Sequence, residues 1–135
     1  MAAADVAVII ELSGQDGLRF DCDNATSISK GTLLVISADI GVTKSAATAD
    51  QRYAGVAVAD KVAGDGSTKI AVHTPGQSNI FDMKCDVSTV SAGVMVCLSG
   101  INTIRNMTDS EFEMGQCIGQ SYEEGAGGDV IRVRS

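Results

Sequence analysis

The reactive side chains of this sequence are four cysteines and a single histidine, His73. A cysteine nucleophile needs a base within hydrogen-bond reach, and His73 is the only histidine that could serve as that base. Alternation of apolar and polar residues places Cys85 on an apolar strand face, whereas His73 shares a polar face with Lys69. The pattern argues against a Cys–His dyad, and we expect no catalytic residues.

The cysteine spacing also argues against a metal site. A zinc site typically uses paired ligands such as C-x-x-C, and here the cysteines are far apart in the sequence. Three of them fall on or within apolar runs, where a thiol packs as a small hydrophobic group. They are Cys22, Cys85 and Cys97. We therefore expect buried, free thiols with no disulfide, and neither a metal nor a cofactor.

Two further motifs are weak candidates for chemistry. The Gly-rich stretches "AGDGS" and "EGAGGD" lack the Lys-Ser/Thr of a phosphate loop, so they indicate β-turns. The paired acids Asp21 with Asp23 and Glu123 with Glu124 stand beside turns, without the aromatic residues on which sugars stack. A solvated surface accounts for them.

Charge and composition exclude several classes of partner. The net charge of −7 repels phosphate backbones and anionic lipid headgroups, so neither nucleic acid nor a membrane is an expected partner. The apolar run near the N-terminus has no basic flank and is bounded by Asp5 and Glu11, which favours synthesis in a cytoplasm without a signal peptide or membrane span.

A length of 135 residues fits one domain, or two small lobes that share a core, and the composition favours an all-β fold. Fifteen glycines against one proline, with only 4% aromatic residues, suggest short strands joined by tight turns around a core of small aliphatic side chains. We expect a compact β-sandwich or β-barrel with little helix. Only "TDSEFEMG", within residues 108–115, has the character of a short helix.

The first thirty residues predict an N-terminal arm or hairpin, followed by a β domain over 31–135. The segment "DVAVIIEL" alternates at strand period, as does "LRFDCD", and Asp16-Gly17 between them is a hairpin signal.

The rest of the chain predicts further strands. Gly31–Ser37 and "GVMVCLSG" are continuous apolar runs typical of buried strands, and "AGVAVA" is a narrower one. Three other segments alternate. Their inward residues are Ile70 and Val72, then Phe81, Met83, Cys85 and Val87, and finally Ile131 and Val133.

The two halves of this domain, about 31–73 and 93–135, resemble each other at an offset of roughly sixty residues. Glycines align in order: Gly31 with Gly93, Gly55 with Gly119, and Gly66 with Gly127. The pattern indicates two similar units that together complete a sandwich or barrel. The alternative is that any β protein punctuated by glycines aligns with itself in this way.

A family resemblance follows from five segments in order. They are "KGTLLVIS", "TADQRYAGVAVAD", "GDGSTKIAV", "VSAGVMV" and "IGQSYEEGAGGDVIRVRS". This succession, over about Gly31 to Ser135, resembles the small capsid decoration, or cement, proteins of tailed viruses. The chain departs from that pattern at Gln120-Ser121-Tyr122 and in its four cysteines.

The resemblance implies a non-enzymatic virion protein, made in the host cytoplasm, that binds the outer surface of the assembled capsid and stabilises it. It implies the major capsid protein as partner and a homotrimer as the assembly. Two alternatives remain open: another virion component such as a head-fibre base or tail protein, and a small β module that binds carbohydrate or peptide.

The N-terminal arm is the candidate capsid-binding segment, because an extended apolar segment can add a strand to a neighbour's sheet edge. Its apolar face comprises Val6, Val8, Ile10 and Leu12. The alternative is that this segment is the first strand of the chain's own sheet, paired through the Asp16-Gly17 hairpin.

Overall fold

The computed structural model describes residues 7–11, 17–47, 51–76, 79–107 and 116–135, and these residues form strands and no helix. The all-β fold predicted from composition is confirmed. The strands are β1 (Val8–Glu11), β2 (Leu18–Asp21), β3 (Leu33–Ala38), β4 (Gly41–Lys44), β5 (Tyr53–Ala57), β6 (Lys69–His73), β7 (Ile80–Cys85), β8 (Met95–Gly100), β9 (Thr103–Asn106), β10 (Cys117–Ser121) and β11 (Val130–Arg134).

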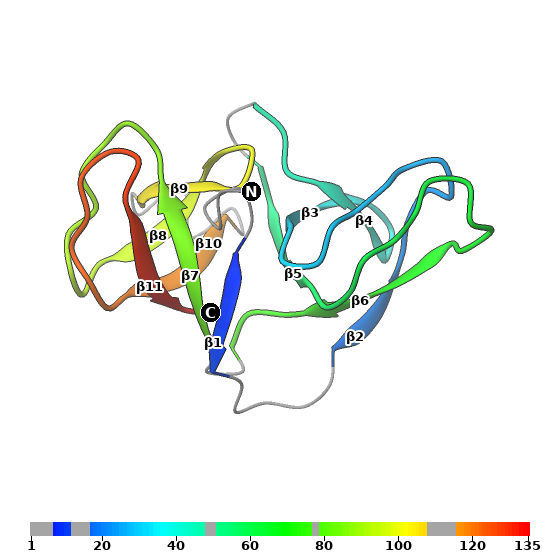
Figure 1. Ribbon diagram of the computed structural model, residues 1–135, viewed down its shortest axis with the longest axis horizontal. Helices are drawn as coiled ribbons and strands as arrows, with labels where there is room; N and C mark the ends of the chain where they lie inside the picture. The colour runs from blue at the N-terminus through cyan, green and yellow to red at the C-terminus, as the bar shows by residue number, and fades with distance from the viewer. Residues whose placement is uncertain (1–6, 12–16, 48–50, 77–78, 108–115) are drawn as a thin grey trace.

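Strands β2 to β6 close into a barrel in the order β2-β4-β3-β5-β6, on the right in Figure 1. All neighbours are antiparallel except β2 and β4, which are parallel. Alternating small aliphatic side chains fill the interior, as a narrow barrel requires. These are Ile28, Leu34, Val42, Ala54, Ala57, Ile70 and Val72.

Strands β7 to β11 form a second ring, on the left in Figure 1. They belong to a six-stranded sheet of order β1-β7-β11-β10-β8-β9, and an additional parallel pairing of β9 with β7 joins its strands into a circle. Strand β1 pairs with the N-terminal half of β7, at Val8 with Asp82, whereas β9 pairs with its C-terminal half.

The two rings have the same strand order and the same sense of pairing, so β2 to β6 correspond in turn to β7 to β11. Hydrogen bonds repeat as well: Ser45 N donates to Leu33 O at 2.9 Å, and Met107 N donates to Met95 O at 3.0 Å. Each ring thus begins one strand earlier than the halves 31–73 and 93–135, because β2 and β7 supply its first strand.

Aligned glycines occupy equivalent places in the two rings. Gly31 and Gly93 have φ of 87° and 83°. Gly66, with φ of 82°, corresponds in conformation to Gly128 at 85°, one residue beyond the predicted Gly127. A further pair lacks glycine altogether: Ile40 and Asn102, at the β3–β4 and β8–β9 turns, have φ of 52° and 53°.

The two rings pack against each other along a seam. The apolar cluster inside the second ring extends to Leu33, Tyr53 and Val56 of the first barrel. These side chains are buried although they belong to the outer face of a barrel. This explains why all five residues of β5 are buried, since one face of the strand lines the interior and the other faces the seam.

The predicted N-terminal hairpin is wrong. Strand β1 pairs with β7, and β2 pairs with β6 and β4, so the two segments belong to different rings. Asp16 lies outside the described residues, as do Val6, Leu12 and the helix expected at 108–115. The hairpin signal is local, whereas the partner of each strand is set by ring closure.

Two predicted orientations are also corrected. Val87 is 96% exposed, because β7 ends at Cys85 and the Asp86 carboxylate accepts a hydrogen bond from Ser88 N in a turn. His73 was placed on a polar face with Lys69, yet it is buried with its ring 6.0 Å from that of Phe81. The seam covers the end of β6. By contrast, Ile131 and Val133 are buried as predicted.

Candidate functional site

None of the four cysteines is part of a disulfide. Cys85 and Cys97 are buried as predicted, whereas the predicted burial of Cys22 is wrong, because β2 ends at Asp21 and Cys22 is only partly covered. Cys117 is partly covered as well. The strand register places Cys117 opposite Cys97, which sequence separation alone did not suggest. Across the described ranges, no group of three His, Cys, Asp or Glu side chains could hold a metal ion.

The electrostatic environment favours the protonated thiol at three of these positions. Burial is the main factor that raises the pKa of Cys22, Cys85 and Cys117 above the usual value. At Cys85 the nearby carboxylates of Asp129 and Asp86 raise the pKa further. Because the thiolate is the reactive form, these cysteines are poor nucleophiles at neutral pH.

Cys85 therefore has a packing role, and Cys85→Ala should destabilise the fold by about 1 to 2 kcal/mol through a small cavity. The measurement is the free energy of unfolding from urea denaturation of both proteins. Cys22→Ala is the matched control and should cost less, since Cys22 is partly exposed. An unchanged free energy for Cys85→Ala, or zinc bound stoichiometrically to the purified protein, would contradict this role.

Of the candidate capsid-binding residues, Val8 and Ile10 lie on β1. This strand is the end strand of its sheet, and its pairing with β7 breaks register between Ile9 and Glu11, so Ile10 sits at a β-bulge. Such a strand belongs to the chain's own sheet, and its second edge has no partner among the described strands. The role of Val6, Val8, Ile10 and Leu12 in capsid binding stays a prediction.

The seam is fastened by the β8–β9 turn of the second ring. Asn102 Oδ1 accepts hydrogen bonds from Leu33 N at 2.9 Å and from Ser45 Oγ at 3.1 Å. The backbone N–H of Asn102 donates to Ser45 Oγ at 3.0 Å. Asn102, in a left-handed turn conformation, thus binds the first residue of β3 and the residue that follows β4.

A second polar contact closes the other end of the seam. The Tyr53 hydroxyl lies 3.3 Å from Ser135 Oγ, and Ser135 Oγ donates to Ile118 O at 3.0 Å. Burial raises the pKa of Tyr53 far above its usual value, so this hydroxyl is uncharged at any ordinary pH. We call the side of the first barrel that meets the second ring the docking face. It comprises Leu33, Ser45, Tyr53 and Val56.

The second ring has the equivalent face, and in the part of the chain that the structure describes this face is partly exposed. The strand register makes Met95, Cys117 and Gln120 the counterparts of Leu33, Tyr53 and Val56, and Met107 the counterpart of Ser45. Leu33 is 0% exposed, whereas Met95 is 37% exposed. Cys117, Gln120 and Met107 are all partly exposed. We call these four residues the open face.

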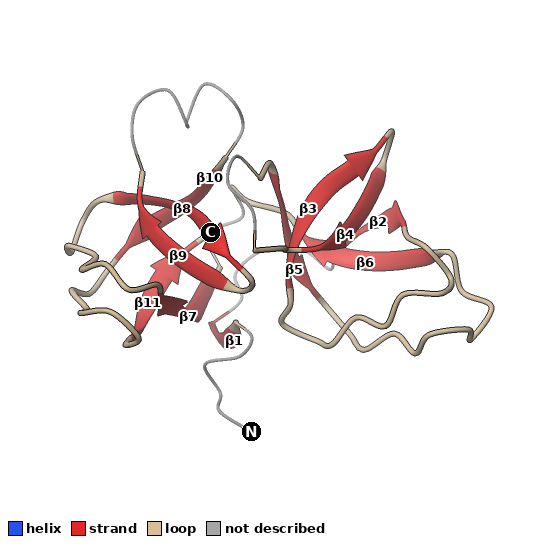
Figure 2. Cartoon of the chain, turned by 90° about the horizontal axis from the view of Figure 1, so that it is seen from above, coloured by secondary structure: helices blue, strands red, loops and turns tan. Residues whose placement is uncertain are grey.

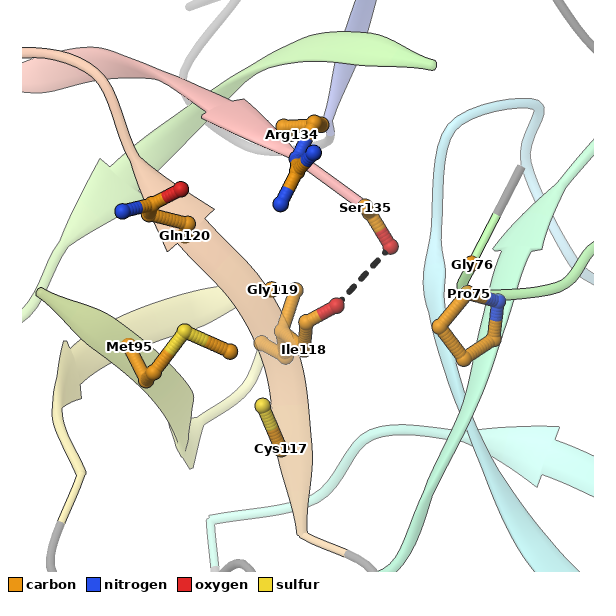
Figure 3. Close-up of a pocket in the computed structure, with 9 residues that line it drawn as sticks. All are labelled: Pro75, Gly76, Met95, Cys117, Ile118, Gly119, Gln120, Arg134 and Ser135. Carbon is orange, nitrogen blue, oxygen red and sulfur yellow. Dashed lines mark hydrogen bonds between the residues drawn. The ribbon is translucent and has the colours of Figure 1, made fainter. Parts of the chain in front are cut away.

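The open face is hollowed. Three of its residues line a concavity of about 420 Å³ together with Gly119, Arg134 and the Pro75-Gly76 segment. Figure 3 shows Met95, Cys117 and Gln120 along one wall and Pro75 across from them. A concave surface with an apolar floor and a few polar groups is suited to receiving a projecting element of another molecule.

The first barrel also carries the counterpart of the turn that fastens the seam. Ile40 takes the place of Asn102, and its side chain is 68% exposed. Figure 2 shows the β3–β4 turn on the side of the barrel that faces away from the second ring. Among the described residues, the β3–β4 turn of the first barrel and the open face of the second ring are thus both exposed to a partner.

Comparisons with known proteins give no family for this chain: no family model matches it, and no curated protein matches its sequence. Within the described part of the chain, no helix has the length and apolarity to cross a membrane.

Proposed function

We propose that this chain is a virion structural protein that binds the outer surface of the assembled capsid and stabilises it, as a decoration or cement protein. It is made in the host cytoplasm, its partner is the major capsid protein, and it acts by binding rather than by catalysis. On the shell it is a homotrimer.

One observation carries this proposal. The segments that resemble decoration proteins form β3, β5 and β6 in the first barrel and β8, β10 and β11 in the second ring. These are the same three strands of each ring, so the resemblance follows a repeated structural unit and not a scattered set of glycines. A protein built from repeated units with an open face is suited to binding a repeated surface.

The segment proposed to contact the capsid is β1. As the end strand of its sheet, it can accept a further strand from the shell through its open edge. Individual contacts can be modest, because occupancy at about a hundred times the dissociation constant stabilises the bound state by roughly 2.7 kcal/mol at each site. Many copies repeat this gain over the shell.

The direct test is cosedimentation with purified expanded capsids and, separately, with unassembled capsid subunits of the virus that encodes the chain. We expect saturable binding to the capsids alone and a higher temperature of capsid disruption. Failure to bind the capsids would contradict the proposal, and binding to tail structures instead would support the alternative of another virion component.

The contribution of β1 is tested by Ile10→Lys. Ile10 lies at the bulge, so the change should leave the pairing with β7 in place while adding a charge that opposes strand addition at the edge. We expect a folded protein whose capsid affinity falls by about tenfold, measured by cosedimentation. Val130→Lys, at an exposed position of β11, controls for the added charge and should bind normally. Normal binding by Ile10→Lys would exclude β1 as the attachment segment.

A further inference from the structure

The contact between the two rings of one chain joins a turn to a docking face, and two chains can make a contact of the same kind. The seam joins the β8–β9 turn of the second ring to the docking face of the first barrel, and it is fixed by the hydrogen bonds of Asn102 to Leu33 and Ser45. Because the two rings have the same topology, each contains both a turn and a docking face. Within the described ranges, one turn and one face are joined to each other in the chain, those of the seam.

The β3–β4 turn and the open face are complementary in chemistry. Inside the chain the turn presents a polar residue, Asn102, to the polar Ser45. Between chains the turn would present the apolar Ile40 to Met107, the counterpart of Ser45, and to Met95, the counterpart of Leu33. The turn residue changes from Asn102 to Ile40 and the residue that faces it from Ser45 to Met107. Both therefore change from polar to apolar, and the pair stays matched.

The conformation of Ile40 also points to a contact. A β-branched residue with φ of 52° is strained, and such residues persist where the surrounding structure or a function requires them. The turn is held rigidly, since Asp21 N donates to Ile40 O at 2.8 Å. A rigid turn that displays a large apolar side chain to solvent is preorganised for binding.

We propose that the β3–β4 turn of one copy, with Ile40 at its tip, docks on the open face of a second copy, formed by Met95, Met107, Cys117 and Gln120. The contact is head-to-tail, because it joins the first barrel of one chain to the second ring of the next. A head-to-tail contact of this kind forms a closed ring when its rotation closes, as the proposed trimer requires, and every barrel then meets its neighbour through the same turn and face.

Crosslinking between two differently tagged chains tests the contact in solution, without capsids. One chain carries Ile40→Cys and the other Met95→Cys, both in a Cys22→Ser, Cys117→Ser background, and a short bismaleimide is added. In the seam the equivalent residues are joined by the 2.9 Å hydrogen bond from Leu33 N to Asn102 Oδ1, so we expect efficient crosslinks between the two tags. Val62→Cys, a similarly exposed position in another loop, replaces Ile40→Cys as control and should give none.

Sedimentation equilibrium of the native sequence gives the strength of the same contact. Ile40→Asp should raise the dissociation constant by about 30-fold or more, the effect of removing a central apolar anchor. Val62→Asp should leave it unchanged. A native protein that stays monomeric up to about 1 mM, or one that associates without the 40–95 crosslink, would overturn the proposal. Either result leaves capsid binding by single chains testable separately, so failure of this contact and failure of the proposed function are distinguishable.

Discussion

Gly119→Ala should destabilise the protein by about 3 kcal/mol, at the upper end of what an overpacked methyl group costs. The added Cβ would overlap the carbonyl group of Arg134 and the Cα of Ser135, which are backbone atoms of the adjacent β11 end and cannot rotate away. Strands β10 and β11 would have to separate where Gln120 pairs with Arg134, and this opens the second ring beside the hollow. The measurement is the free energy of unfolding by urea.

The matched control for that change is Gly128→Ala. A Cβ at Gly128 meets no atom within 4 Å, but the residue has φ of 85°, so alanine there should cost only about 1 kcal/mol through its backbone conformation. Gly55→Ala should behave like Gly119→Ala, since its Cβ would overlap the carbonyl of His73 at the equivalent place in the first barrel. Equal, small losses for Gly119→Ala and Gly128→Ala would show that the strands do not approach as closely as described.

Asn102→Ala should cost a similar amount, about 3 kcal/mol, for a different reason. The change leaves the buried N–H of Leu33 without the oxygen that now accepts from it, a loss of about 1 to 3 kcal/mol. It also places alanine in a left-handed conformation that asparagine tolerates better, at a further cost of about 1 kcal/mol. Urea denaturation of the two proteins gives the total.

Two variants separate these contributions. Asn102→Gly removes the hydrogen bonds but relieves the backbone, so its loss should be smaller than that of Asn102→Ala. Ile40→Gly, at the equivalent turn of the first barrel, should cause no loss in the dilute monomer, because Ile40 is exposed and its conformation is strained. A loss at Ile40→Gly as large as at Asn102→Ala would mean that the turn, and not the seam, determines the stability.

Local patterns in the sequence predicted much of the fold. Alternation correctly placed Phe81, Met83 and Cys85 inside, because a strand with one buried face carries its apolar residues at every second position. The glycine spacing also held information on the two rings, since Gly55 and Gly119 both stand where the last strand of a ring comes too close for a side chain. Such constraints act within a few residues and leave a direct trace in the sequence.

Long-range packing could not be predicted in the same way. Nothing in the segment around Leu18 indicates that β2 pairs with β6 in one ring while β1 joins the other. The contrast between buried Leu33 and exposed Met95 depends on which ring receives the turn, and both residues lie in apolar runs that predict burial equally. Asn102 likewise has no local signal, because its partners stand 57 and 69 residues away.

The most direct test of the account is electron cryomicroscopy of expanded capsids saturated with the protein. We expect added density on the outer surface at repeated threefold sites, with the β1 edge toward the shell and the turn of residues 38–41 of each copy seated on the Met95 face of the next. Bare capsids, or density confined to the portal or tail, would contradict the proposed function. Isolated monomers at sites without threefold symmetry would contradict both the trimer and the head-to-tail contact.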